Sequence, residues 1–259
     1  MIYCIICDTI KLDFNNLTNN KRIIAVKLIV LYDKPLIGNQ RLFPRDIRNY
    51  IGSISSEEDK EFTMWHKREL PHILYTMPNR KGFAIVSYKD DDFTKKLFER
   101  IKTNIQNNPN INFQNNNIQV KVKEAYIIDY GYTNFKPQFE ERLLKTPMLM
   151  RQFARAKSIT RDVKDINIQD LEKLVTDEIK ESISYMYKNW FDKDIDLSDL
   201  MLVYKDLKYL VVKYKDDQYF PAIQGTIIAN KKLPDFVGYN IGLGYGELER
   251  KKNTDRRGQ

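Results

Sequence analysis

Leu233-Pro-Asp-Phe-Val-Gly-Tyr-Asn-Ile-Gly-Leu-Gly-Tyr-Gly-Glu247 holds four of the ten glycines in the chain. The four lie within nine residues, at Gly238, Gly242, Gly244 and Gly246. This clustering indicates a local structural requirement for glycine rather than a glycine-rich composition. Glycine adopts positive φ without strain and lets a ligand approach the backbone closely. Several such residues can point their N–H groups at one anion. The stretch predicts an anion-binding loop or, as the structural alternative, a bent edge strand or bulged hairpin.

Two well-known phosphate motifs do not fit this stretch. The dinucleotide fingerprint needs a helix directly after its glycines, and the few residues after Gly246 are too short to supply one. A Walker loop needs Gly-Lys-Ser/Thr, which does not follow here. On a basic chain, the natural anion for such a loop is a phosphate backbone, and the structural alternative stays open.

The composition predicts a folded basic protein. Of 259 residues, 42% are hydrophobic, which is enough for one large core or two small ones. The net charge of +8 favours polyanionic partners such as nucleic acid, although the same charge also serves solubility.

Cysteine usage and hydropathy indicate which cell compartment, metals and cofactors to expect. Cys4 and Cys7 have no second pair and make a poor zinc site, so we expect no metal, no cofactor and a reducing compartment. No signal peptide is visible, and the longest apolar run, Ile23 to Tyr32, is too short to span a bilayer. We therefore expect a cytoplasmic protein without a membrane partner.

The first half of the chain reads as strand, helix, strand, strand, helix, strand. Its expected elements are a central strand at 23–32, a short helix at 43–52, strands at 72–77 and 82–88, a helix capped by Asp90-Asp-Asp92, a polar loop at 104–117 and a strand at 118–128. At a helix N-terminus the three aspartates favour capping over metal binding. This order is that of a ferredoxin-like βαββαβ unit.

The second half repeats part of that order. We expect an extended segment at 139–150, a helix at 168–191 with one apolar stripe, strands at 200–204, 209–214 and 219–229, and then the glycine segment. The predicted fold class is α+β, with two tandem ferredoxin-like (RRM-like) domains. The predicted domains are 1–130 and 131–259, inferred from element order alone.

Several segments together resemble the CRISPR-associated repeat-processing endoribonucleases, the Cas-six family of RAMP proteins. The glycine segment after Leu233-Pro-Asp resembles the C-terminal glycine-rich loop of that family. The other similar segments, in chain order, are Arg45-Asp-Ile-Arg-Asn-Tyr-Ile-Gly52, Leu70-Pro-His-Ile-Leu-Tyr75, Gly82-Phe-Ala-Ile-Val86, Leu143-Leu-Lys-Thr-Pro-Met-Leu-Met150 and Gly225-Thr-Ile-Ile-Ala-Asn230. The resemblance covers residues 23 to 250.

This resemblance implies metal-independent cleavage of CRISPR repeat RNA. It also implies a guide RNA that stays bound or passes to subunits of an effector complex. One departure concerns the loop, where family members often place Lys or Arg between the glycines and this chain has Tyr239, Asn240, Ile241, Leu243 and Tyr245. Main-chain N–H groups are therefore expected to hold the RNA backbone. The sequence leaves open whether the protein is a monomer or a homodimer.

Cleavage without metal uses the 2′-OH of the RNA as nucleophile. A base removes its proton, an acid protonates the leaving 5′-oxygen, and cations hold the phosphorane charge, giving a 2′,3′-cyclic phosphate and a 5′-OH. Histidine suits both proton steps. The chain has only His66 and His72; we predict His66 as base or acid with Lys67 beside it, and His72 as the second candidate or a packed histidine.

The predicted RNA-binding residues combine arginines near the first helix with the loop. An arginine face at period three to four contacts phosphates or is merely solvated, and loop tyrosines stack on unpaired bases. The full set is Arg41, Arg45, Arg48, Arg68, Gly238, Tyr239, Asn240, Gly242, Gly244, Tyr245 and Gly246.

Two other functions stay open at this point. One is a non-catalytic RNA-binding RAMP subunit of an effector complex, and the other is an unrelated ferredoxin-like binding module with structural glycines. A cyclic phosphodiesterase with two His-x-Thr motifs is excluded, because neither His66 nor His72 has a threonine two residues later.

Overall fold

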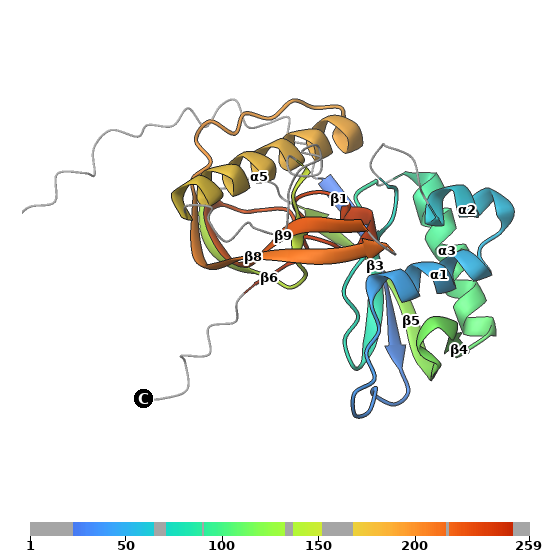
Figure 1. The fold of residues 1–259 in the computed structure, drawn as a ribbon. Coiled ribbons are helices and arrows are strands. Elements are labelled where there is room, and N and C mark those ends of the chain that lie inside the picture. Colours follow the sequence, from blue (N-terminus) through green and yellow to red (C-terminus); the bar gives the residue numbers. More distant parts are fainter. Residues whose placement is uncertain are drawn as a thin grey trace, which may run out of the picture.

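The computed structural model describes residues 23–64, 71–89, 91–132, 137–151, 168–215 and 218–250. Its first sheet and the helices beside it come from the N-terminal half (Figure 1). The elements of this half are β1 (Ile23–Tyr32), α1 (Pro44–Ile54), α2 (Glu57–Thr63), β2 (Leu74–Tyr75), β3 (Gly82–Ser87), α3 (Asp92–Asn107), β4 (Asn110–Phe113), the 3₁₀ turn η2 (Gln114–Asn116) and β5 (Ile118–Tyr132).

The first sheet has the strand order β2-β3-β1-β5-β4, and all its pairings are antiparallel. Without the edge strand β4 this is the ferredoxin-like order, so the predicted βαββαβ unit is confirmed. β1 lies in the middle, as its continuous apolar run predicts. Its side chains Leu28 and Val30 are fully buried in one core with Ile47 of α1 and Leu97 of α3.

Three local expectations in this half were incomplete. α1 runs two residues beyond Gly52, and α2 was not predicted, although Ser56 caps it by accepting the Asp59 N–H at 3.2 Å. The expected polar loop at 104–117 instead contains the end of α3 and the strand β4. The capping role of the aspartates is confirmed at Asp91, which accepts the Thr94 N–H at 2.7 Å.

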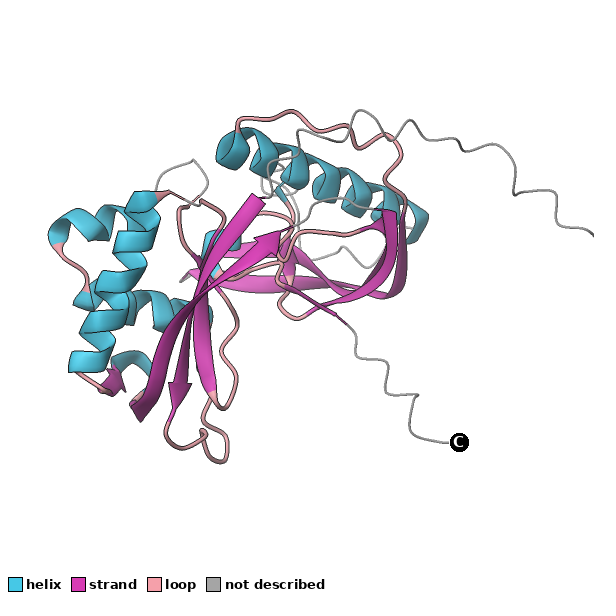
Figure 2. Cartoon of the chain, turned by 180° about the vertical axis from the view of Figure 1, so that it is seen from behind, coloured by secondary structure: helices cyan, strands magenta, loops and turns pink. Residues whose placement is uncertain are grey.

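The second half forms a second sheet covered by one long helix (Figure 2). Its elements are β6 (Pro137–Leu144), β7 (Met148–Leu149), α5 (Ile168–Phe191), β8 (Leu202–Lys215), β9 (Gln218–Lys231), the 3₁₀ turn η4 (Ile241–Leu243) and β10 (Leu248–Arg250). The order is β10-β6-β9, with β8 on the other edge of β9 and β7 continuing the edge of β6. The ferredoxin-like order therefore occurs twice, and the predicted α+β fold of two tandem units is confirmed.

The second unit differs from the first in two respects. The two strands expected at 200–204 and 209–214 are one strand, β8, whose register shifts between Lys205 and Lys208, where Asp206 has a φ of 53°. Between β9 and β10, all residues are described and none forms an α-helix. The glycine-rich loop (residues 233–247) stands where the first unit has α3.

The two units pack on each other through apolar side chains. Ala25, Val86 and Tyr88 from the first sheet belong to the same buried cluster as Ile183 of α5 and Leu233 of the loop. The Tyr88 and Trp190 rings lie 4.9 Å apart across the junction. The boundary predicted between residues 130 and 131 stays a prediction; β5 ends at Tyr132 and β6 begins at Pro137.

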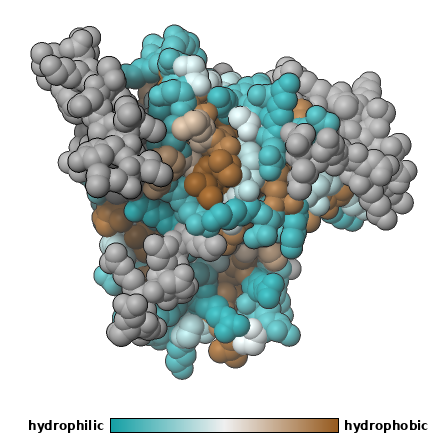
Figure 3. All heavy atoms as spheres, turned by 90° about the vertical axis from the view of Figure 1, so that its left-hand side faces the viewer, coloured by the Kyte–Doolittle hydropathy of each residue, from teal (hydrophilic) through white to brown (hydrophobic). Residues whose placement is uncertain are grey.

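The face of the second sheet turned away from α5 is open. Leu143 and Val203 are 42% and 59% exposed, while their neighbours Leu144 and Tyr204 point toward the α5 side. Figure 3 shows the side of the molecule at the left of Figure 1, where brown apolar areas lie between teal hydrophilic ones. None of the helices in the described part combines the length and apolar character needed to cross a membrane.

Candidate functional site

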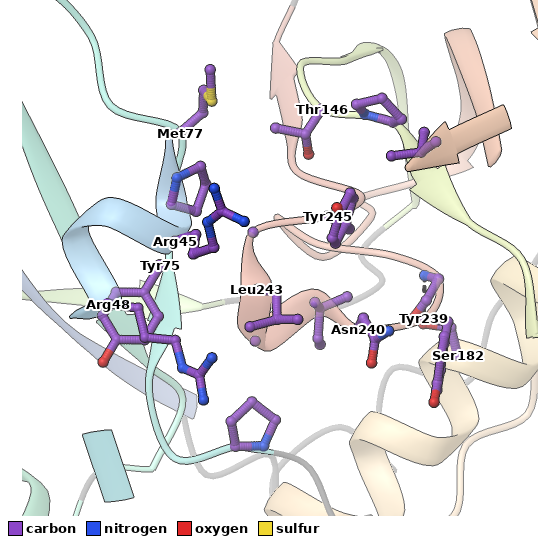
Figure 4. Close-up of a pocket in the computed structure, with 18 of the residues that line it drawn as sticks. Arg45, Arg48, Tyr75, Met77, Thr146, Ser182, Tyr239, Asn240, Leu243 and Tyr245 are labelled. Carbon is purple, nitrogen blue, oxygen red and sulfur yellow. Dashed lines mark hydrogen bonds between the residues drawn. The ribbon is translucent and has the colours of Figure 1, made fainter. Parts of the chain in front are cut away.

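A cavity of about 780 Å³ lies where the two units meet. Its walls come from α1 and the segment before β2 on one side, and from α5, the Thr146-Pro147 turn and the glycine-rich loop on the other. Figure 4 shows Arg45 and Arg48 on one side of this space, Tyr239, Asn240 and Ser182 on the opposite side, and Leu243 between them. Both halves of the chain are therefore needed to form the site.

The glycines let the loop approach the N-terminal unit closely. A Cβ on Gly244 would lie 2.3 Å from the Pro44 side chain and 2.8 Å from the Tyr75 carbonyl oxygen, and φ at this residue is +82°. A Cβ on Gly242 would lie 2.5 Å from the Pro71 ring. Any larger residue would push the loop away from α1. Close packing across the junction accounts for these two glycines.

Several main-chain donors of the loop are already used inside the protein. The Gly238 N–H donates to the Ser182 hydroxyl at 2.8 Å, and the Tyr239 N–H donates to the Leu149 carbonyl at 3.0 Å. Gly246 donates to the Pro147 carbonyl at 3.0 Å, and Gly244 closes the turn η4 onto Ile241 at 2.9 Å. The sequence reasoning assigned the backbone N–H groups to an RNA phosphate, and these four are instead bonded within the fold.

Ion pairs fix both ends of the loop. At its start, Asp235 pairs with the buried Arg142 at 2.9 Å, and the Leu233 N–H donates to Glu140 at 2.6 Å. At its end, Glu247 pairs with Lys145 at 3.0 Å. The same two side chains bind the main chain of Met77, whose N–H donates to Glu247 and whose carbonyl accepts from Lys145 at 3.1 Å.

The Glu247–Lys145 pair therefore connects the loop to the N-terminal unit. Burial raises the pKa of the Glu247 carboxyl, because removal from water disfavours its charged form, and the positive charge of Lys145 works in the opposite direction. The desolvation of Glu247 is the larger effect.

The α1 wall carries two of the three arginines predicted beside the first helix. Arg45 is exposed and lines the cavity. Arg48 also lines it but is 8% exposed, and its guanidinium donates to the Met64 carbonyl at 3.1 Å. Arg41 is exposed and lies outside the cavity. The three arginines therefore differ in exposure and in whether they line the cavity, which the sequence alone did not indicate.

The opposite wall is a polar and aromatic face of α5. Glu178, Ser182 and Tyr185 follow one another at helical spacing and line the cavity, while Ile179, Ile183 and Met186 form the buried stripe. Arg151 joins this wall: its guanidinium carbon lies 5.2 Å from the Tyr185 ring centroid and 5.5 Å from that of Tyr239. The sequence reasoning missed Arg151 and Tyr185. The spacing of the polar α5 residues was the signal that could have indicated Tyr185.

No protein-family model matches the chain, and no curated protein is similar to it in sequence. Solved structures do match. A crystal structure of Cas6b superimposes with a TM-score of 0.66 at 16% identity, over 88% of this chain and all of that one. A RAMP protein that binds different RNA substrates gives 0.54 at 10% identity, over 88% and 99%. A Cas6-related protein from Pyrococcus furiosus gives 0.55 at 12% identity, over 89% and 98%. The chain has the fold of the Cas6 and RAMP proteins.

Within this Cas6-like fold, the two histidines fall in different situations. His66, Lys67 and Arg68 lie outside the described residues, but Thr63 and Pro71, on either side of them, line the cavity. His72 is half-buried outside the cavity, with its ring centroid 4.9 Å from that of Phe62 and 6.4 Å from that of Phe93. Its Nε2 lies 3.4 Å from the Lys89 amine. This environment fits the packed-histidine interpretation of His72.

Proposed function

We propose that the protein binds CRISPR repeat RNA in the cavity between its two units and cleaves it as an endoribonuclease. The observation that carries this proposal is the cavity itself, with an arginine wall from one unit and a glycine-rich loop from the other. The similar structures add support, because one is a Cas6b CRISPR RNA processing endoribonuclease and another is a Cas6 product complex. The basic net charge favours the same class of ligand.

The proposed reaction needs no metal. The 2′-OH of the RNA attacks the adjacent phosphorus, its proton passes to a base, and an acid protonates the departing 5′-oxygen. The products are a 2′,3′-cyclic phosphate and a 5′-OH, which together account for every atom of the broken phosphodiester. Within the described residues, no group of three or more metal-ligating side chains occurs.

We assign one of the two proton transfers, as base or as acid, to His66. The positions of Thr63 and Pro71 on the cavity wall support this assignment, since the chain leaves and rejoins the described part at the site. Lys67 and Arg68, next to His66, and the exposed Arg45 are proposed to hold the negative charge of the phosphorane. The N-terminal domain, residues 1–130, would then supply the chemistry, and residues 131–259 would supply the loop.

Cleavage of a repeat RNA tests the proposal directly. A repeat from the CRISPR array of the encoding genome, incubated with the protein in EDTA, should give fragments with cyclic phosphate and 5′-OH ends. The matched control is the same RNA with a single 2′-deoxy sugar at the cleaved position, which removes the nucleophile and should stay intact. Cleavage of the deoxy substrate, or a strict need for a divalent metal, would exclude this mechanism.

A non-catalytic RNA-binding subunit of a CRISPR effector complex is the second candidate. One observation favours it: a RAMP protein that binds different RNA substrates is among the similar structures. This alternative predicts tight binding of repeat RNA with no cleavage under any condition, and co-purification with other subunits. The cleavage experiment therefore separates the two functions.

A further inference from the structure

The α5 wall of the cavity presents three planar groups together. The Arg151 guanidinium lies over the Tyr185 ring and over the Tyr239 ring, at 5.2 Å and 5.5 Å from their centroids. The three residues come from different parts of the chain: the segment after β7, the middle of α5 and the glycine-rich loop. All three line the cavity and all three are half-buried.

Besides the contacts between the Arg151 guanidinium and the two rings, hydrogen bonds and an ion pair hold this wall in place. The Arg151 main-chain N–H donates to Glu178 at 2.9 Å, and its guanidinium lies 3.6 Å from a Glu181 oxygen. The Tyr239 backbone is fixed by its hydrogen bond to Leu149. Side chains that are already ordered lose little conformational entropy when a ligand stacks on them.

The chemistry of the wall differs from that of the α1 side. Arg45 and Arg48 offer positive charge, which suits phosphate. Tyrosine rings and guanidinium planes are the surfaces on which proteins stack unpaired RNA bases. Figure 4 shows Arg45 and Tyr239 on opposite sides of the cavity. A nucleotide between them would therefore direct its phosphate toward Arg45 and its base toward Tyr239.

The size of the cavity selects single-stranded RNA. Its volume of about 780 Å³ lies within the range of small-ligand pockets, which accommodates one or two nucleotides but not a duplex. Resting on the proposed function, we propose that Arg151, Tyr185 and Tyr239 form a stacking site for one unpaired nucleobase of the RNA substrate, with its phosphate directed toward Arg45. The RNA at this position is then unstructured or has a base turned out of its stem.

A fluorescent base measures this stacking. The probe is a 12-nucleotide oligouridylate with one 2-aminopurine; its neighbouring uracils stack little, so its fluorescence falls when it stacks on an aromatic ring. We expect quenching with the unmodified protein. Tyr239→Leu should abolish the quenching and weaken binding about tenfold, in the range measured for single stacked bases. Tyr239→Phe keeps the ring and should retain both, and Tyr126→Leu, a half-buried tyrosine of β5 outside the cavity, should change neither.

A second variant guards against misfolding of the loop. Arg151→Lys keeps the positive charge but removes the planar guanidinium, so it should reduce quenching while the melting temperature stays unchanged. The defects of both variants should persist as salt is raised, since stacking is not a phosphate contact. Quenching and affinity that match the unmodified protein in both variants would overturn the site, as would equal affinity of the protein for the same strand in a duplex.

The repeat-cleavage assay distinguishes this inference from the proposed function. Quenching that depends on Tyr239, in a protein that cuts no repeat RNA, would reject the endoribonuclease and keep the stacking site. Cleavage by the unmodified protein together with normal quenching by Tyr239→Leu would reject the stacking site and keep the endoribonuclease.

Discussion

The two units share a strand order but use it differently. The first sheet runs β5-β1-β3-β2 and the second β10-β6-β9-β8, so each has the same antiparallel core. The first unit covers its sheet with α1 and α3, whose apolar faces are buried in one cluster. In the described part of the second unit the sheet is covered by α5, and the connection between β9 and β10 is the glycine-rich loop.

The absent helix is what creates the site. A helix between β9 and β10 would lie on its own sheet, as α3 does in the first unit. The loop instead reaches the other unit, where Gly244 lies against Pro44 and Tyr75, and Glu247 holds the Met77 backbone. Under the proposed function, the first unit would supply His66 and the phosphate-binding arginines, and the loop of the second unit would complete the RNA site.

The largest effect should come from His66 in the first unit. His66→Ala should reduce the rate of repeat cleavage by about two to four orders of magnitude, because general acid–base catalysis contributes that much. Binding of uncut RNA should change little. Single-turnover cleavage rates and a filter-binding affinity measure the two separately.

His72 provides the matched control. It packs against Phe62 and Phe93, so His72→Ala should lower the melting temperature and leave the cleavage rate of the folded protein nearly intact. If His72→Ala abolishes cleavage and His66→Ala does not, the assignment of the two histidines is reversed.

The next effect tests the loop of the second unit. Gly244→Ala combines a left-handed φ of +82° with contacts at 2.3 Å to Pro44 and 2.8 Å to the Tyr75 carbonyl, and should lower the free energy of unfolding by about 3 kcal/mol. The displaced loop should also weaken RNA binding. Urea unfolding and binding assays on the same preparation give both numbers.

Gly38→Ala separates the backbone strain of a positive φ from the loss of close contact at the junction. Gly38 has a φ of +56°, but no atom lies within 4 Å of the position that an alanine Cβ would occupy, so alanine there should cost only about 1 kcal/mol and leave RNA binding unchanged. Equal losses in the two variants would mean that the junction contact contributes nothing.

Regular elements of the fold could be predicted from local patterns. The apolar run of β1 indicated a central strand, and the stripe from Leu171 to Met186 gave the bounds of α5 correctly. The sequence pattern predicted two strands in place of β8, because the irregularity around Asp206 interrupts the alternation of side chains. It did not predict α2, because seven mainly polar residues carry little periodicity. The continuity of β8 and the formation of α2 depend on tertiary contacts, which a local sequence pattern does not reveal.

The site was harder to predict because it joins distant segments. Arg45, Tyr239 and Asn240 were candidates from motif and composition, and the cavity brings them together. Arg151 follows a short strand in an unremarkable sequence, and only the packing of β7 beside the loop places it over Tyr239. The glycine pattern correctly indicated a local backbone requirement: Gly242 and Gly244 lie against the first unit, and Gly238 and Gly246 lie against Met148 and Val237 of their own unit. Binding of an RNA phosphate by this loop stays a prediction.

A smaller effect tests the arginines of the first unit. Arg45→Ala should weaken RNA binding several-fold. The slope of log K against log salt concentration should become shallower by about one unit, as expected for one lost phosphate contact. Arg41→Ala, four residues earlier and outside the cavity, should change the slope less. If Arg41→Ala has the larger effect, the RNA follows the outer surface of the first unit.

The smallest effect concerns the pair that connects the two units. In the unfolded chain Glu247 ionises near its ordinary pKa of 4.5, and burial raises this pKa in the folded protein. Between these two values the folded state holds more protons, so the free energy of unfolding falls as the pH rises through the window.

Glu247→Gln cannot ionise, so its stability should fall less over the same pH range. Urea unfolding from pH 4 to pH 8 measures the difference, and Glu249→Gln, an exposed carboxyl on β10, should keep the pH dependence of the unmodified protein. If Glu247→Gln keeps it as well, the pKa of Glu247 is not raised by folding. If the stability of Glu247→Gln falls more steeply with pH than that of the unmodified protein, the Lys145 ammonium outweighs the burial of Glu247 and lowers its pKa. The link between loop and first unit would then be an ordinary ion pair, strongest at neutral pH.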